Sequence, residues 1–172
     1  MEETKELTEQ ETVELMEMQL LEEECTVSIE EDLDYPPTAL SLGEQIIQTP
    51  KGDITVPIPI GTYGNFSFVQ APPKTKKTFF ISLLSSVFLS GQNNFGGNIK
   101  GHRDGRCLLH FDTEQGTWHA QRVFKRVKNM AGDIDVGCYK TFALRTINYK
   151  KRIKFIEYIL EQNKGNNGLV VI

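Results

Sequence analysis

Residues 66–78 read Phe66-Ser67-Phe68-Val69-Gln70-Ala71-Pro72-Pro73-Lys74-Thr75-Lys76-Lys77-Thr78, and this stretch decides the predicted fold. The apolar residues within 66–70 predict a short buried strand. Residues 78–90 have the length and apolar content of an α-helix, and Gly91 marks its end. A loop rich in proline and lysine lies between the two, so the predicted order is strand, basic loop, helix.

The same alternation continues toward the C-terminus. Residues 106–112 predict a strand that is buried on both faces, and residues 117–131 predict a helix. A strand over 139–146, an amphipathic helix over 148–163 and a strand over 168–172 follow. Strands that alternate with helices favour a parallel sheet with helices on both faces. The sequence therefore predicts an α/β fold.

The chain before residue 66 and the chain after Gly91 show weaker patterns. Residues 40–47 predict a short helix, and residues 54–60, which alternate with prolines, predict an edge strand. Residues 92–105 are rich in glycine and asparagine, so they are predicted to form a loop.

Charge is distributed unevenly along the chain. Residues 1–34 carry 14 acidic side chains and one lysine, whereas the remaining residues carry 18 Lys and Arg against 9 Asp and Glu. We therefore expect an acidic N-terminal segment over 1–37, with a helix over 9–24 or disorder, and a globular domain over 38–172. The basic body suits a polyanion such as a nucleotide or nucleic acid. The alternative is a solvated surface with a disordered acidic tail.

Several classes of protein are disfavoured by composition. Cys25, Cys107 and Cys138 show neither a CxxC pair nor metal-ligand spacing, which favours free thiols in a reducing compartment. No signal peptide is expected, because no apolar stretch follows a basic N-terminus. The longest apolar stretch, residues 79–89, is too short to span a bilayer. We expect a cytoplasmic protein with no membrane partner.

The loop at 71–78 partly fits the Walker A pattern of phosphate-binding loops, G-x-x-x-x-G-K-[ST]. Lys77 and Thr78 stand in the correct places, but Ala71 and Lys76 replace the two glycines. A left-handed backbone at Lys76 would cost about 1–2 kcal/mol. Extra positive charge from Lys74 and Lys76 would offset part of that cost by attracting phosphate. The alternative is a basic, solvated turn.

Acidic and amide side chains follow the strand predicted at 106–112. Asp112-Thr113-Glu114-Gln115 stands at the carboxyl end of that strand, where parallel α/β sheets bind ligands. Glu114 is a candidate for orienting or deprotonating a water molecule. The alternative is a carboxylate that stabilises the N-terminus of the following helix.

The helix predicted at 117–131 carries a basic cluster. Arg122, Lys125, Arg126 and Lys128 form either a solvated face or a contact for DNA phosphates or for a neighbouring subunit's nucleotide. Trp118 and Phe124 of this helix are predicted to lie in the core.

These motifs together resemble the RecA-like ATPases of the RepA hexameric helicase group, in particular the variants of mobile elements and replication proteins in Bacteroides-type bacteria. The resemblance covers residues 38–172 and is carried by 65–69, by the lysine-rich loop ending in Lys77-Thr78, and by 112–115. It implies that Lys77 binds phosphate, Thr78 ligates Mg²⁺ and Glu114 activates water. The residues implied to surround the nucleotide are Ala71, Pro73, Lys74, Thr75, Lys76, Lys77 and Thr78.

The resemblance implies a P-loop domain that binds and hydrolyses ATP with Mg²⁺ and acts on single-stranded DNA, assembled as a hexameric ring. It also implies that the domain is incomplete at its C-terminal end, with the Walker B aspartate and any arginine finger lying beyond Ile172. Two alternatives stay open: a nucleotide- or DNA-binding adaptor without turnover, and an interaction protein whose acidic head recruits a basic partner.

Overall fold

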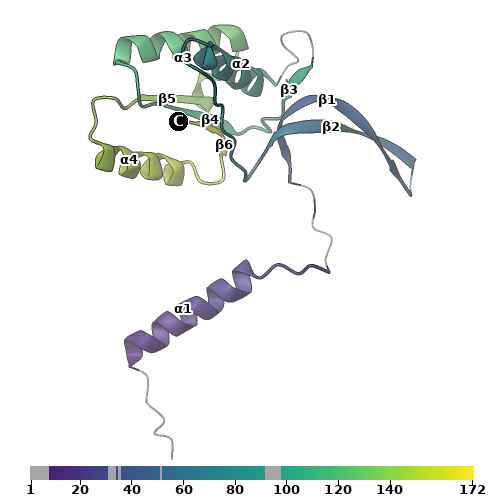
Figure 1. The fold of residues 1–172 in the computed structure, drawn as a ribbon, viewed down its shortest axis with the longest axis vertical. Coiled ribbons are helices and arrows are strands. Elements are labelled where there is room, and N and C mark those ends of the chain that lie inside the picture. Colours follow the sequence, from purple (N-terminus) through teal and green to yellow (C-terminus); the bar gives the residue numbers. More distant parts are fainter. Residues whose placement is uncertain (1–7, 31–33, 35, 51, 92–97) are drawn as a thin grey trace, which may run out of the picture. The chain divides into compact units, whose positions relative to one another are not determined.

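The computed structural model describes residues 8–30, 34, 36–50, 52–91 and 98–172. The chain divides into two compact units, Met1–Tyr35 and Pro36–Ile172, whose elements are labelled in Figure 1. The first unit contains helix α1 (Glu9–Cys25), which begins at a capping box. The Thr8 hydroxyl accepts a hydrogen bond from the Glu11 amide, and the Glu11 carboxylate accepts one from the Thr8 amide. No residue of α1 is buried.

The second unit begins with an antiparallel sheet in the order β2-β1-β3, formed by β1 (Thr38–Thr49), β2 (Gly52–Thr62) and β3 (Ile99–Gly101). The edge strand predicted at 54–60 is confirmed, because it lies within β2 at the border of this sheet. The helix predicted at 40–47 is wrong. Leu40 and Leu42 pair with β3, and Ile46 and Ile47 pair with β2, so strand partners on both sides outweigh a weak helical pattern.

The loop predicted at 92–105 is wrong in part. Residues 99–101 form β3 and pair with β1, while residues 92–97 lie outside the described residues. Gly101 permits this pairing close to α2, because a Cβ atom at this position would lie 2.3 Å from the carbonyl oxygen of Val87.

The second sheet is parallel, in the order β5-β4-β6. Its strands are β4 (Cys107–Asp112), β5 (Tyr139–Ala143) and β6 (Asn167–Val171), and its helices are α2 (Lys77–Ser90), α3 (Thr117–Ala131) and α4 (Tyr149–Gln162). A short 3₁₀ helix, Val136–Cys138, precedes β5. These elements confirm the α/β class and the strands and helices predicted from residue 106 onward, within one or two residues at most ends.

The two faces of the parallel sheet carry separate cores. Leu108 packs with Phe88 of α2 and Val127 of α3 on one face. Leu109 and Phe111 pack on the other face against α4, including Phe155. Adjacent residues of β4 point to opposite faces, and every residue of β4 is buried. Figure 1 shows α2 and α3 above this sheet and α4 below it.

The strand predicted at 66–70 is wrong. These residues form no strand, and the side chains of Phe66 and Phe68 are 84% and 90% exposed. Their rings contact each other edge to face, with centroids 5.6 Å apart. Apolar residues form a strand only where a neighbouring backbone supplies hydrogen bonds, and none of the strands formed by the described residues pairs with 66–70.

The core position predicted for Trp118 is also wrong, because its side chain is 60% exposed. Helix α3 packs inward through Ala120, Val123, Val127 and Ala131, which recur at helical spacing. Trp118 lies two residues before Ala120 and hence on the opposite side of the helix. Phe124 is partly buried, with its ring 4.9 Å from the ring of His110.

Candidate functional site

The lysine-rich loop enters α2 through a left-handed residue. Lys76 is the N-cap of α2, with φ of 64° and ψ of 28°. This is the conformation that favours glycine, and it occurs at the second glycine position of the Walker A pattern. A neighbouring residue, Lys74, also has a positive φ of 66°. The loop therefore takes the backbone shape for which glycine is usual while carrying lysine at both positions.

The beginning of α2 leaves backbone donors available. The amides of Phe79 and Phe80 donate to the carbonyl oxygen of Lys76, at 2.9 and 3.1 Å. Lys76 makes no side-chain cap hydrogen bond, and the amides of Lys77 and Thr78 have no partner among the described residues. Free amides and the positive end of the helix dipole attract anions. Residues 72–78 are all exposed, so an anion can reach these donors.

The side chains of the loop suit a phosphate group. Lys74, Lys76 and Lys77 are exposed cations, and Thr78 presents a hydroxyl group on the first turn of α2. The hydroxyl of Thr75 is engaged within the loop instead, because it donates to the carbonyl oxygen of Pro72 at 2.6 Å. Pro73 is exposed and Ala71 is partly buried. The charge and donors of this loop therefore fit a polyphosphate.

A second polar feature lies at the carboxyl end of β4. Asp112 is buried, and its Oδ1 accepts hydrogen bonds from the amides of Glu114 (3.0 Å) and Gln115 (2.7 Å). Its Oδ2 accepts a further bond from the side-chain amide of Gln115 at 3.0 Å. The Asp112 carboxylate thus holds the tight loop 113–115, and the side chain of Glu114 is left exposed. An aspartate that accepts from the amide two residues ahead is an Asx turn.

Arg152 of α4 supports the same edge of the sheet. Its guanidinium donates to the carbonyl oxygen of Thr113 after β4, at 3.3 Å, and to those of Arg145 and Ile147 after β5, at 3.4 and 3.2 Å. It therefore ties α4 to the ends of both strands. Sequence patterns did not separate Arg152 from the neighbouring lysines of α4, because only the fold brings these three carbonyl groups around one side chain.

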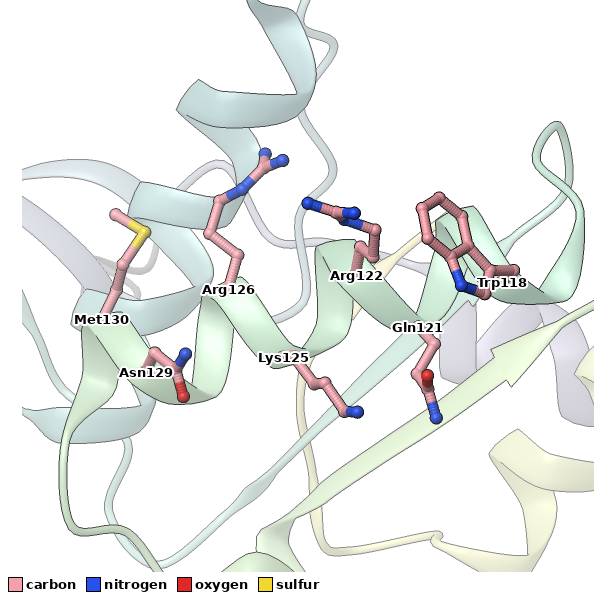
Figure 2. A pocket seen from close by; sticks show the side chains of 7 residues that line it. All are labelled: Trp118, Gln121, Arg122, Lys125, Arg126, Asn129 and Met130. Atoms are coloured by element: carbon pink, nitrogen blue, oxygen red, sulfur yellow. The ribbon is translucent and has the colours of Figure 1, made fainter.

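Among the described residues, no hydrogen bond or ion pair joins the loop at 71–78 to the Asp112–Gln115 turn. The first turn of α2 contacts α3 instead, where the guanidinium carbon of Arg126 lies 5.8 Å from the ring centroid of Phe79. Arg126 belongs to an open groove along α3, shown in Figure 2. Its lining includes Trp118, Gln121, Arg122, Lys125, Arg126 and Asn129.

His110 on β4 is a core histidine. It is 5% exposed, and its Nδ1 lies 3.1 Å from the Tyr139 hydroxyl in a hydrogen bond. Burial lowers the pKa of His110 to about 4, although the nearby Asp112 carboxylate opposes this shift. Burial also raises the pKa of Tyr139. Both groups are therefore neutral at pH 7, and they stabilise the core.

Comparisons with protein-family models, with curated proteins and with solved structures give no match. Within the described part of the chain, no three His, Cys, Asp or Glu side chains gather to hold a metal ion. Of the helices formed by the described residues, none combines the length and apolar composition needed to cross a lipid bilayer.

Proposed function

We propose that this chain is a nucleotide-binding domain of the RecA-like P-loop type, which binds ATP at residues 71–78. The observation that carries the proposal is the left-handed backbone of Lys76 at the uncapped start of α2, directly before Lys77 and Thr78. A left-handed lysine costs about 1–2 kcal/mol, so a fold keeps one where something compensates for the strain. An ATP polyphosphate on the free amides of α2 would supply that compensation.

The residues of the loop have distinct proposed roles. Lys77 holds the β and γ phosphates by charge, while Lys74 and Lys76 add to the positive potential. The remaining loop residues, Ala71, Pro73 and Thr75, surround the nucleotide. Thr78 offers its hydroxyl to Mg²⁺, as the Ser or Thr of P-loops does. The bound Mg²⁺ would neutralise phosphate charge.

Glu114 is the proposed general base for ATP hydrolysis, with Asp112 as a positioning residue. The support is that Asp112 fixes the loop 113–115 through three hydrogen bonds and leaves the Glu114 side chain accessible to solvent. In the proposed protein, hydrolysis drives action on single-stranded DNA, of the kind seen in replication or mobile-element maintenance. A hexameric ring is part of this proposal through the sequence resemblance.

A nucleotide- or DNA-binding adaptor without turnover is the second candidate. One observation favours it: the loop 71–78 and the turn containing Glu114 are not joined by any hydrogen bond or ion pair of the described residues. Under this function, Lys77 binds nucleotide but Glu114 has no water to activate. The two candidates share the phosphate site and differ only in phosphate release.

The test uses the full chain. Binding of a fluorescent ATP analogue and release of phosphate are measured with and without single-stranded DNA. We expect Lys77→Ala to abolish binding and Glu114→Gln to abolish hydrolysis while binding is retained. Lys151→Ala is the matched control, because Lys151 is an exposed lysine on α4.

The outcomes separate the two functions. ATP binding that depends on Lys77, without phosphate release under either condition, would support the adaptor and exclude the motor. ATP binding equally strong in the Lys77→Ala variant would overturn both functions, because neither would then use the lysine-rich loop.

A further inference from the structure

Helix α3 presents a face that its packing does not explain. Its inward side chains fill the core, while Trp118, Arg122 and Arg126 form an outward row with four-residue spacing. Gln121 and Lys125 form a second, parallel row beside it. Figure 2 shows the first row directed to one side of the helix axis and the second row to the other. Successive residues within a row are about 6 Å apart along the axis.

The charge of this face is of one sign. Arg122, Lys125 and Arg126 contribute three cations, and among the described residues that line the groove there is no acidic side chain. The one ion pair of the described residues joins Lys164 to Glu161 on another part of the molecule. The three cations are therefore available to an external anion, and a row of cations matches a chain of phosphates.

The aromatic residue on this face points to the kind of anion. Trp118 is 60% exposed, and the guanidinium carbon of Arg122 lies 4.8 Å from its ring centroid. This cation–π contact holds the indole ring on the surface, where one of its faces can stack on a planar group. Unpaired bases present such planar groups, and proteins bind them by combining aromatic platforms with a basic groove. In a duplex the base faces are already stacked on each other.

We propose that the outward face of α3 binds single-stranded nucleic acid, with Trp118 stacking on a base and Arg122, Lys125 and Arg126 contacting phosphates. Arg126 also contacts Phe79 on the first turn of α2, so this surface adjoins the lysine-rich loop. The inference deepens the proposed function by naming the surface for its DNA partner. It uses no residue of the loop 71–78, so it can fail or hold separately from ATP binding.

The test measures binding of a fluorescent oligothymidine to the full chain by anisotropy, over a series of salt concentrations. Arg122→Glu with Arg126→Glu is expected to weaken binding at least tenfold. It should also make the slope of log K against log salt shallower by about 1.4, because two phosphate contacts of a single strand are lost. Trp118→Ala is expected to weaken binding about tenfold, and Trp118→Tyr to restore most of it.

The matched control is Lys151→Glu with Lys154→Glu on α4, which changes the net charge equally on exposed residues. This control is expected to weaken binding less than threefold. Circular dichroism checks that each variant keeps its helices. All substituted side chains except Arg126 are exposed, and Arg126 is only partly buried, so folding should be retained.

Three outcomes would overturn the inference: an equal loss in the α4 control, unchanged binding in Trp118→Ala, or tighter binding of a duplex or of an acidic polypeptide than of the single strand. Binding of ATP and of oligothymidine is measured on these variants and on Lys77→Ala. Loss of ATP binding in Lys77→Ala with oligothymidine binding intact supports both proposals. Oligothymidine binding that depends on Trp118, in a protein that binds no ATP, overturns the proposed function and leaves the α3 surface standing.

Discussion

Asp112 is bonded twice to one residue, Gln115: its Oδ1 accepts from the backbone amide at 2.7 Å, and its Oδ2 accepts from the side-chain amide at 3.0 Å. With the further bond from the Glu114 amide, all hydrogen bonds that this carboxylate accepts from described residues come from Glu114 and Gln115. The loop after β4 is thus held by hydrogen bonds among its own residues. These bonds use the backbone amide of Glu114 and leave its side chain exposed.

Replacing Asp112 by alanine is expected to lower the free energy of unfolding by about 2–3 kcal/mol, because three donors lose a charged acceptor. Asp112→Asn keeps an oxygen for the two backbone amides, so its loss should be smaller. Urea denaturation measures both. Equal losses in the two variants would contradict the hydrogen-bonding role of the carboxylate.

The left-handed backbone at Lys76 can be tested by comparing two substitutions that shorten its side chain. Lys76→Gly and Lys76→Ala both remove the charge and the long side chain, but only glycine relieves the strain of a positive φ. We expect the glycine variant to be more stable than the alanine variant by about 1 kcal/mol. At Lys77, which opens α2, the order should reverse, because alanine is the better helix former. Thermal and urea unfolding give the four values.

The close approach of α2 to the parallel sheet depends on Gly168. A Cβ atom there would lie 2.5 Å from the Phe88 ring and 2.9 Å from the carbonyl oxygen of Cys107. Gly168→Ala is therefore expected to destabilise the fold by about 1–3 kcal/mol. Gly61→Ala in β2 is the control, since a Cβ atom at Gly61 would meet only the Cβ of Leu40, at 4.0 Å. A Gly168→Ala protein as stable as the control would show that this packing is loose.

Stability should fall in acid because of His110. Its pKa is about 4 in the folded chain, against 6.5 for a free histidine, so the unfolded chain binds the extra proton as the pH falls. The stabilising effect of neutral His110 is complete above pH 6.5 and is lost between pH 6.5 and 4. His110→Asn, which keeps a polar partner for Tyr139, should lose about 2 kcal/mol less stability than the parent between pH 7 and 4.5.

His119 provides the comparison for this pH effect. His119→Asn removes an exposed histidine of α3 instead of the buried one and is unfolded alongside as a control. Urea unfolding at a series of pH values gives the free energy of unfolding of the parent and of both variants. If the parent and His110→Asn show the same pH dependence, the acid sensitivity comes from other groups.

Local patterns predicted the elements around β4 well. Each of these patterns depends on a few neighbouring residues. The buried run at 106–112 indicates β4, the helical spacing of Val123 and Val127 indicates α3, and Gly91, which is left-handed, marks the end of α2. In the candidate site, the pattern also located the strained position, since the chain is left-handed at Lys76, where the Walker A pattern has its second glycine.

Those patterns did not predict which segments, distant in the sequence, pair with each other. Leu40 belongs to a strand because it pairs with β2 and β3, and Ile46 because it pairs with β2, whereas Phe66 belongs to no strand because no described strand pairs with it. Arg152 gathers carbonyl groups from two loops that are distant in sequence. Each of these outcomes depends on which backbone groups the fold brings together.

The sequence by itself determined the α/β class, the order of the main strands and helices from β4 onward and the basic loop at the start of α2. The tertiary structure decided the strand order β5-β4-β6, the exposure of Trp118 and the contact of Arg126 with Phe79. The physical reason is the range of the interactions. Helix periodicity and turn conformation depend on neighbouring residues, whereas sheet order and surface exposure depend on which distant segments compete for the same edge or face.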